Sequence, residues 1–453
     1  MSKAKLIEKY NVQGPRYTSY PTVPYWEQES EIQDHWKEHV KQSFEMSNGA
    51  QGIALYIHLP FCSNACTYCG CNVRFTQNHK VELPYIAYVL KEWKLYLGLM
   101  NEVPRIAEVH IGGGTPTFFS PENLHYLLSE IFKDVSFTPN AELSFEGNPE
   151  STSEEHLTTL YNLGFRRLSL GIQDFDPNVQ ELINRIQSVE LVESVVKQAR
   201  EIGYNSINFD LIYGLPQQRL EAMQQTLTAV IRLKPDRIAF YSYAHVPWIK
   251  GIQRRFTEED LPKGDEKRAL YELGKTMFEK AGYVEIGMDH FALPTDGLVQ
   301  AFNKKALHRN FMGYSTNTTQ LMVGLGVSSI SDTWTACGQN EKQQRNYEKK
   351  IDQGQFPVFR GHLLTDEDLN LRKHILNIMC HFQTSWSPEE SLNSFYPAIM
   401  AWREMERDGL LVLEEHTLFV TEKGKPFVRN ICMALDARLQ RSNPEKQLFS
   451  STV

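Results

Sequence analysis

The sequence predicts an α/β protein built on a partial (β/α)6-type barrel. Two observations support this prediction. Short β-like runs alternate with helical stretches along the chain, and a cysteine, glycine or polar residue follows each run. Strands that alternate with helices form parallel sheets, whose carboxyl ends meet at one edge. The six expected strands are residues 53–57, 108–111, 142–145, 167–170, 206–209 and 237–240.

The segments that follow these strands are expected to form one mouth, because barrel active sites are built from the loops after the strands. A lone Gln or Asp would ordinarily be a plain loop residue, but six such segments in register favour a shared site. They are residues 62–71 and 112–117, then Glu146, Gln173, Asp210 and the pair Tyr243 and Ala244. After the cysteines, apolar residues that recur on one face predict a helix over residues 84–97.

Two further regions flank the expected barrel. We predict an N-terminal segment over the active site (1–50), the barrel with its extension (51–360) and a mostly helical C-terminal domain (361–453). The C-terminal domain should contain a helix after Thr365, a helix over 397–407, a hairpin of strands 410–413 and 417–420, and a last helix ending near Leu435. This order resembles a winged-helix-like module. Glu414 and Glu415 in the hairpin argue against DNA binding, so a cover over the active site is the expected role.

Composition excludes several classes of protein. The 453-residue chain has a net charge of −8, whereas a nucleic-acid binder is typically basic. No run of about 18 apolar residues predicts a membrane span, and the N-terminus lacks the apolar region of a signal peptide. The chain has seven cysteines, and an odd number without a secretion signal indicates a reducing compartment. We therefore expect a cytoplasmic protein, and we expect it to be a monomer.

Four of the cysteines lie within ten residues, at Cys62, Cys66, Cys69 and Cys71. So dense a thiolate cluster suits zinc, copper(I) or an iron–sulfur cluster. Disulfides within the cluster are the alternative, which a reducing compartment disfavours. A structural zinc site is a second alternative, but such sites usually take two separated pairs of ligands.

A run of three glycines, residues 112–114, is followed by Thr115 and Pro116. Glycines after a strand let backbone approach a ligand closely. The run lacks the lysine of a Walker loop and does not match the G-x-G-x-x-G dinucleotide fingerprint. The run fits a nucleotide-like ligand other than ATP or NAD better. The alternative is a tight turn with a purely structural role.

Taken together, these motifs resemble the radical S-adenosylmethionine (SAM) superfamily. The resemblance lies in Tyr56-x-His58, the spacing Cys62-x3-Cys66-x2-Cys69, and the Gly-Gly-Gly-Thr-Pro run. It implies a [4Fe–4S] cluster that Cys62, Cys66 and Cys69 ligate through three irons, with the fourth iron open to SAM. It also implies a 5′-deoxyadenosyl radical made from SAM, so that the difficult chemistry belongs to the cofactor.

Nearly end to end, the chain resembles the oxygen-independent coproporphyrinogen III oxidase family. The resembling segments are residues 14–22, 69–71, 171–175, 184–187, 210–216, 243–245, 287–291 and 307–314. The resemblance implies that two propionate groups of coproporphyrinogen III become vinyl groups, which gives protoporphyrinogen IX. It also implies a one-electron donor and an electron acceptor, neither of which the sequence identifies.

The resemblance implies two SAM sites. The cluster-bound SAM would contact Tyr56, Gly113, Glu146 and backbone near Ile330. A second SAM would contact Tyr68, Gly114, Thr115, Gln173, Arg185, Asp210 and Ala244. Asp210 could accept ribose hydroxyls and Arg185 could pair with a carboxylate. Cys71 and Glu146 are the candidate catalytic side chains. Cys71, left without an iron, would face the substrate or tune the site, or would be a small buried thiol.

A substrate with four propionates needs cationic groups at the edge of its pocket. One candidate source is Arg16, together with Tyr17 and Tyr20. The other is the pair His308 and Arg309, and either could instead be ordinary surface charge.

Rival functions also follow from the resemblance. Asn148 is typical of a related radical-SAM haem chaperone, whereas Cys71, residues 184–187 and residues 14–22 argue against that branch. A radical-SAM haem-degrading methyltransferase is a second rival. A structural iron–sulfur or zinc protein without turnover is the third.

Overall fold

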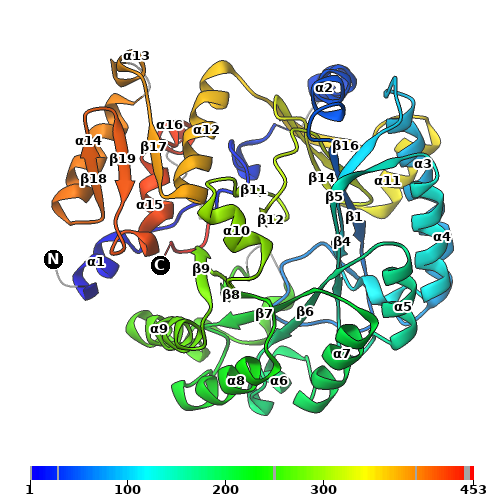
Figure 1. Ribbon diagram of the computed structural model, residues 1–453, viewed down its shortest axis with the longest axis horizontal. Helices are drawn as coiled ribbons and strands as arrows, with labels where there is room; N and C mark the ends of the chain where they lie inside the picture. The colour runs from blue at the N-terminus through cyan, green and yellow to red at the C-terminus, as the bar shows by residue number, and fades with distance from the viewer. Residues whose placement is uncertain (1–2, 28–29, 248–250, 393–394, 443–448, 453) are drawn as a thin grey trace.

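The computed structural model describes residues 3–27, 30–247, 251–392, 395–442 and 449–452. In that part of the chain, six parallel strands form the centre of a twelve-stranded open sheet (Figure 1). In sheet order these strands are β1 (Ile53–Leu59), β4 (Arg105–Gly113), β5 (Ser136–Gly147), β6 (Arg167–Gln173), β7 (Ser206–Tyr213) and β8 (Arg237–Ser242). The predicted α/β class and the six parallel strands are confirmed.

Short strands that were not predicted extend both edges of this sheet. Beyond β1 lie β13 (Met322–Leu325), β14 (Ile330–Asp332), β15 (Ala336–Asn340) and β16 (Val358–Leu363). Beyond β8 lie β10 (His290–Ala292) and β9 (Val284–Gly287). Only β13 joins its neighbour β1 in parallel; the other pairings at the two edges are antiparallel.

Helices cover the outer face of the sheet, as the alternating pattern predicts (Figure 1). They are α3 (Glu82–Leu97), α4 (Pro121–Phe132), α5 (Glu154–Asn162), α6 (Pro177–Ile183), α7 (Val189–Ile202), α8 (Leu220–Leu233) and α9 (Gly264–Lys280). Helix α7 shows why these segments are helical. The Ser188 hydroxyl caps its start, Val192, Val195 and Ala199 bury one face, and Gly203 ends it in the left-handed conformation.

The strands run further than predicted, which corrects the placement of several site residues. Glu146 and Gln173 belong to the ends of β5 and β6, and Asp210 lies in the middle of β7 rather than in a loop. Side chains alternate between the two faces of a strand. Polar residues that face the barrel interior therefore resemble loop residues in the sequence, although they lie within strands.

The C-terminal residues build most of a second, smaller core, which also takes in residues of the N-terminal segment and of 286–314. Helices α12 (Asp366–His381), α14 (Tyr396–Arg407) and α15 (Val428–Met433) pack around a sheet of β17 (Gln383–Ser385), β18 (Leu411–Glu414) and β19 (Thr417–Val420). This order agrees with the winged-helix-like pattern. The remaining elements there are α13 (Pro388–Leu392) and α16 (Ala437–Ser442).

The N-terminal residues contact two parts of the molecule. Helix α1 (Lys3–Tyr10) lies against the C-terminal core, where Lys9 Nζ and Tyr10 Oη donate to Asp408 at 2.6 and 2.7 Å. Helix α2 (Ser30–Asn48) instead packs against β1, β15 and β16. Figure 1 shows both chain ends beside the C-terminal core. The boundaries at residues 51 and 361 stay predictions.

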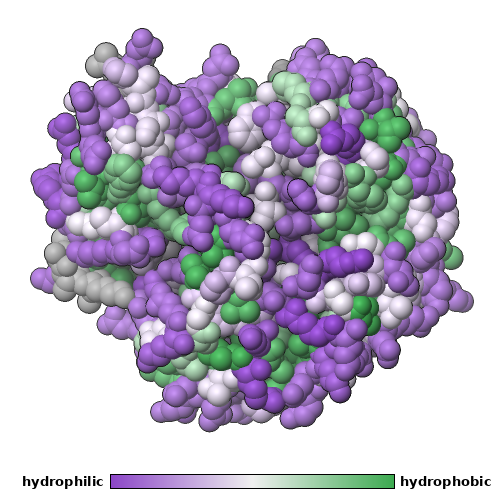
Figure 2. All heavy atoms as spheres, in the orientation of Figure 1, coloured by the Kyte–Doolittle hydropathy of each residue, from purple (hydrophilic) through white to green (hydrophobic). Residues whose placement is uncertain are grey.

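A hairpin closes the inner side of the open sheet. Its strands are β11 (His308–Asn310) and β12 (Gly313–Ser315), and α10 (Gly297–Asn303) precedes it (Figure 1). Two short strands, β2 (Phe61–Cys62) and β3 (Arg74–Phe75), bracket the cysteine loop, and α11 (Gln344–Asp352) precedes β16. The face in Figure 2 is mostly hydrophilic. No helix in the described part of the chain has the length and apolar character to cross a membrane.

Candidate active site

The cysteine loop leaves the carboxyl end of β1, at the mouth that the strand pattern predicts. No disulfide joins any of the seven cysteines, all of which are described. Burial and then the neighbouring thiols Cys69 and Cys66 raise the pKa of Cys62 to about 11, against a hydrogen bond from Thr115. The three predicted ligands therefore lie side by side.

Each of these three sulfurs faces a hydrogen-bond donor. Thr115 Oγ1 donates to Cys62 Sγ at 3.3 Å, and Arg185 Nη1 lies 3.9 Å from Cys66 Sγ. The backbone N–H of Cys71 donates to Cys69 Sγ at 3.4 Å. Donors that face sulfur stabilise the thiolate form and tune iron–sulfur clusters. Cys71 itself lies at the exposed end of the loop.

The cysteine loop offers three neighbouring thiols, the number that a [4Fe–4S] cluster with one open iron needs. Within the described residues, no group of three or more His, Cys, Asp or Glu side chains is arranged around one ion. A structural zinc site needs four ligands converging on one tetrahedral centre. A [4Fe–4S] cube instead takes each sulfur on a different iron, so three neighbouring thiolates suffice.

Each of the three glycines, residues 112–114, has a neighbouring group so close that a Cβ would clash with it. A Cβ on Gly112 would lie 2.8 Å from Glu146 Oε1, and one on Gly113 would lie 2.6 Å from the His58 ring. Gly113 also has a φ of +111°, and a Cβ on Gly114 would lie 2.7 Å from Phe61 O. The run therefore brings backbone against the cysteine loop and the Glu146 carboxylate, beyond what a tight turn needs.

Below the loop, side chains of three adjacent strands form a connected group. Tyr56 on β1 stacks on His110 of β4, with ring centroids 6.0 Å apart and planes 17° apart. His110 Nε2 lies 3.3 Å from Glu146 Oε1, and His110 Nδ1 lies 2.8 Å from the Ser144 hydroxyl. A carboxylate only accepts, so Nε2 carries the proton in this contact. Tyr56 Oη also lies 3.1 Å from His58 Nδ1.

Glu146 is poised as an anion. Burial alone would raise its pKa, but hydrogen bonds from His110 and from the Gly113 N–H at 3.3 Å outweigh burial and lower the pKa. The side chain is 42% exposed, so its carboxylate remains open to a ligand in the barrel. The sequence analysis named Glu146 and missed His110, which the alternation of β4 residues could have placed beside it.

Of the residues predicted for a second SAM, Gly114 and Thr115 lie against the cysteine loop, and the others follow on neighbouring elements. Arg185 Nε donates to Gly171 O at 3.0 Å, and Gln173 is buried close to the same glycine. On β7, Asp210 accepts from Ser169 Oγ and Asn208 Nδ2 at 3.0 and 2.9 Å. Burial and the charge of Glu146 raise the pKa of Asp210 to about 6, against these hydrogen bonds.

The remaining predicted contacts also lie at this edge of the sheet. Tyr68 packs against the apolar cluster that contains Ile183 and Tyr243, and Ala244 is the second residue after β8. Ile330 lies against Gly324, which pairs with Tyr56 across β13 and β1. Helix α6 secures the cysteine loop, because Thr67 N–H donates to Ile183 O at 3.0 Å.

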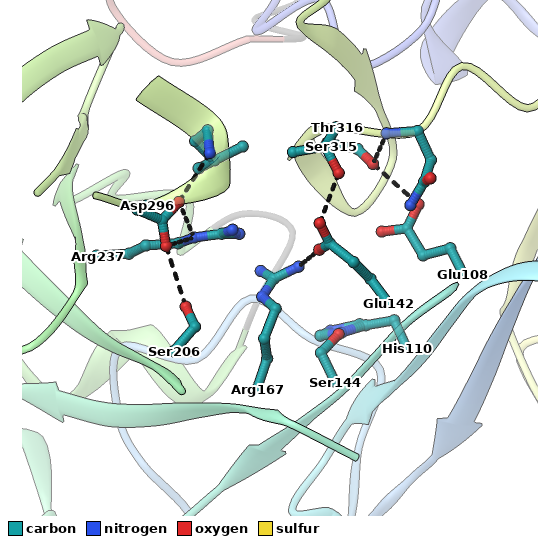
Figure 3. Close-up of polar contacts among 12 residues, drawn as sticks. Glu108, His110, Glu142, Ser144, Arg167, Ser206, Arg237, Asp296, Ser315 and Thr316 are labelled. Carbon is teal, nitrogen blue, oxygen red and sulfur yellow. Dashed lines mark hydrogen bonds and ion pairs between the residues drawn. The ribbon is translucent and has the colours of Figure 1, made fainter. Parts of the chain in front are cut away.

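A polar cavity of about 110 Å³ extends from Glu146 and Asp210 toward the amino ends of the strands. Ion pairs form its floor (Figure 3). Arg167 pairs with Glu142, and Arg237 Nε donates to both oxygens of Asp296 at 2.8 Å. The hairpin joins this floor, because Thr316 Oγ1 donates to Glu142 at 2.5 Å and Ser315 Oγ to Glu108 at 3.0 Å. The sequence analysis missed both arginines.

Arg16, the first cation proposed for the substrate, lies against Tyr241 of the cavity wall. Arg16 pairs with Asp289, and its guanidinium lies 5.7 Å from the Tyr241 ring. Tyr17 donates to Asp436, and both Tyr17 and Tyr20 are buried.

In the second candidate pair, His308 and Arg309, the arginine lies against Tyr314, which also lines the cavity. Arg309 is buried with its Cζ 4.6 Å from the Tyr314 ring centroid, and neither its Nε nor its Nη1 has a hydrogen-bond partner among the described residues. Burial and the charge of Arg372 lower the pKa of His308 to about 4. It is therefore neutral at pH 7 and supplies no positive charge.

Known proteins match this chain in two ways: a family model matches part of it, and individual relatives match nearly all of it. Residues 56–230 match the model of the radical SAM superfamily. An oxygen-independent coproporphyrinogen III oxidase of Helicobacter pylori is 39% identical over 96% of this chain and 96% of its own length. The Escherichia coli protein of that name is 35% identical over 99% of this chain and 98% of its own length.

A solved structure is also similar. It is the coproporphyrinogen III oxidase HemN from Escherichia coli, described as a radical SAM enzyme. It superposes with a TM-score of 0.87 at 34% sequence identity, covering 94% of this chain and 98% of that chain.

Proposed function

The chain belongs to the family of oxygen-independent coproporphyrinogen III oxidases, and from that premise we propose the reaction that it catalyses. It converts two propionate groups of coproporphyrinogen III into vinyl groups and yields protoporphyrinogen IX. One observation supports this function above the others. Three neighbouring thiols, each facing a hydrogen-bond donor, lie beside a glycine run and an ionised glutamate at the carboxyl edge of a parallel sheet.

Cys62, Cys66 and Cys69 hold a [4Fe–4S] cluster, and the donors from Thr115, Arg185 and the Cys71 backbone stabilise its sulfurs. When bound, the cluster and SAM supply a 5′-deoxyadenosyl radical that takes a hydrogen atom from the propionate β-carbon. The bond between the α-carbon and the carboxylate then breaks, CO2 leaves, and one electron passes to an acceptor as the vinyl group forms.

Glu146 receives the ammonium group of the cluster-bound SAM. Its lowered pKa keeps it anionic at neutral pH, and His110 and the Gly113 N–H fix the direction of its carboxylate. Tyr56, which stacks on His110, and backbone at Ile330 border the same space. The chain thereby orients SAM before any chemistry occurs.

The second SAM lies in the same mouth, against Tyr68, Gly114, Thr115, Gln173, Arg185, Asp210 and Ala244. Arg185 already bonds the Gly171 carbonyl and points toward Cys66, so it bridges the second site and the cluster loop. Asp210 accepts ribose hydroxyls only as a carboxylate, so its raised pKa makes this contact weaken below about pH 6.

Other parts of the proposal concern the whole protein. A one-electron donor reduces the cluster, and a separate acceptor takes the electron from the substrate. The protein acts as a monomer in the cytoplasm, in keeping with its net charge of −8 and its clustered thiols.

The reaction can be tested with anaerobically reconstituted protein. Given SAM, a chemical reductant, an electron acceptor and coproporphyrinogen III, the protein should release CO2 and form protoporphyrinogen IX. Tight haem binding with the porphyrinogen left unchanged would instead establish the chaperone function.

A further inference from the structure

The cavity below Glu146 ends at two arginines that lie side by side. Arg167 begins β6 and Arg237 begins β8, and both line the cavity of about 110 Å³. Figure 3 shows the two guanidinium groups pointing into the same space, with Glu142 beside one and Asp296 beside the other.

Neither arginine uses all of its donors on its carboxylate. Arg167 reaches Glu142 through Nη1, and Arg237 reaches Asp296 through Nε alone. Among the described residues, no other hydrogen bond joins either guanidinium to the protein. The Arg237 side chain is only 6% exposed, and it lines the polar cavity. Its two terminal nitrogens are donors that the carboxylate of Asp296 does not use, so they are available to a ligand in the cavity.

The two arginines also repel each other. Burial lowers the pKa of Arg237, and the charge of Arg167 is the next cause of the decrease. An anion between two guanidinium groups would relieve this repulsion. It would also accept planar, bidentate hydrogen bonds, for which arginine is better suited than lysine.

The size of the cavity limits the ligand. Pockets that enclose a drug-sized molecule measure about 300–1,000 Å³. The present cavity accepts a carboxyethyl arm but not a tetrapyrrole. It also connects the floor with Glu146 and Asp210, where the proposed function places SAM. An arm inserted here would hold its β-carbon toward SAM and its carboxylate toward the floor.

We propose that Arg167 and Arg237 form a carboxylate subsite that receives the reacting propionate of the substrate. This inference rests on the proposed function and extends it. The subsite distinguishes substrate from product, because decarboxylation removes the negative charge that the two arginines bind. The uncharged vinyl arm then leaves the cavity, and the second propionate can take its place.

The test measures binding of two stable porphyrins to reconstituted protein with SAM present. Coproporphyrin III retains all four propionates, whereas protoporphyrin IX has vinyl groups in place of the two that react. The wild-type protein should bind coproporphyrin III more tightly. In Arg167→Lys and Arg237→Lys this preference should fall by about tenfold or more, because lysine cannot replace a bidentate guanidinium.

Two controls separate the subsite from folding. Arg200→Lys alters an ion pair with Asp236 that does not line the cavity, and it should keep the wild-type preference. The double variant E142Q/R167Q removes both charges of the Arg167–Glu142 pair, so that no unpaired carboxylate is buried. It should lose the preference for coproporphyrin III over protoporphyrin IX. E142Q alone should retain that preference. Equal preference in wild type, R167K and R237K would overturn the proposal.

Failure of the subsite and failure of the proposed function give different results. SAM cleavage to 5′-deoxyadenosine by the reduced protein, without porphyrinogen, should continue in every variant. If the wild-type protein forms no protoporphyrinogen IX, the proposed function fails. If the wild-type protein does form protoporphyrinogen IX, and the arginine variants keep both the wild-type porphyrin preference and the wild-type KM for coproporphyrinogen III, only the subsite proposal fails.

Discussion

The three sulfurs of Cys62, Cys66 and Cys69 differ from that of Cys71 in what surrounds them. The first three each face a hydrogen-bond donor, whereas Cys71 contributes its backbone N–H to one of them and lies at the exposed end of the loop. Cys62→Ser should therefore abolish the visible iron–sulfur absorbance and all turnover. Cys71→Ser should keep the absorbance, because no ligand is lost. A chromophore that survives in Cys62→Ser would contradict the ligand assignment.

His110 is a positioning residue for Glu146. His110→Phe retains an aromatic ring against Tyr56 but removes the 3.3 Å contact with the carboxylate. We expect SAM binding to weaken by about tenfold, the value of one hydrogen bond to a charged group. The change that SAM causes in the electron paramagnetic resonance spectrum of the reduced cluster measures this affinity.

A matched control for this substitution is His156→Phe. His156 is a buried histidine at the start of α5 that bonds Ser153 and Phe119 O. Its loss should lower stability and leave the SAM titration unchanged. If both variants bind SAM equally well, His110 has no positioning role.

Asp210 should make stability depend on pH. Burial and the charge of Glu146 raise its pKa from 3.8 to about 6 in the folded protein. The folded state therefore holds the proton more tightly, and stability falls as pH rises from about 4 to above about 6. Asp210→Asn removes this loss and should be more stable than wild type by about 1–2 kcal/mol at pH 8, allowing for partial exposure.

Unfolding by denaturant at several pH values measures the effect of Asp210→Asn. The difference from wild type should narrow as pH falls and close well below the unfolded pKa of 3.8, where both folded and unfolded Asp210 are protonated. A constant difference across the pH range would mean that Asp210 does not titrate as described.

At the scale of single residues, sequence spacing alone predicted the roles of the cysteines and of the glycine run. Their chemistry restricts both the residue type and the number of residues between them. Arg167 and Arg237 could not be found in this way. A charged residue at the start of a strand is usually exposed, and only the register of adjacent strands shows that these two share a cavity floor.

Among the elements, the loop that carries the three glycines is tightly fitted. A Cβ on Gly114 would lie 2.7 Å from both Phe61 O and Pro60 C, which are backbone atoms that cannot rotate away. Gly114→Ala should therefore destabilise the protein by about 2 kcal/mol and displace the cysteine loop. Gly49→Ala is the control, because nothing lies within 4 Å of its added methyl group. Denaturant unfolding compares them, and equal stability of the two variants would contradict the tight fit.

The six long strands were predictable because their apolar runs are bounded by turn residues. Their ends were not, since Glu146 and Asp210 are polar yet lie within strands that face the barrel interior. The short strands β9, β10 and β13–β16 have three to six residues. Segments of that length carry too little periodicity to be distinguished from loops.

Across the whole molecule, the two chain ends meet and join the small C-terminal core to the barrel. Arg429 donates to the carbonyl groups of Gly14, Pro15 and Ser451, and Thr452 N–H donates to Val12 O at 2.8 Å. Arg16, from the same N-terminal segment, pairs with Asp289 beside β10. The sequence pattern predicted a covering segment but could not show these contacts, which join residues about 400 positions apart in the chain.

The most direct test of the proposed site follows one hydrogen atom. Coproporphyrinogen III that carries deuterium at the propionate β-carbons is supplied to the reconstituted, reduced protein with SAM and an electron acceptor. A radical formed at the mouth of the barrel should transfer that deuterium to 5′-deoxyadenosine as CO2 is released, and mass spectrometry detects the label. Protoporphyrinogen IX formed together with unlabelled 5′-deoxyadenosine would contradict hydrogen abstraction at this site.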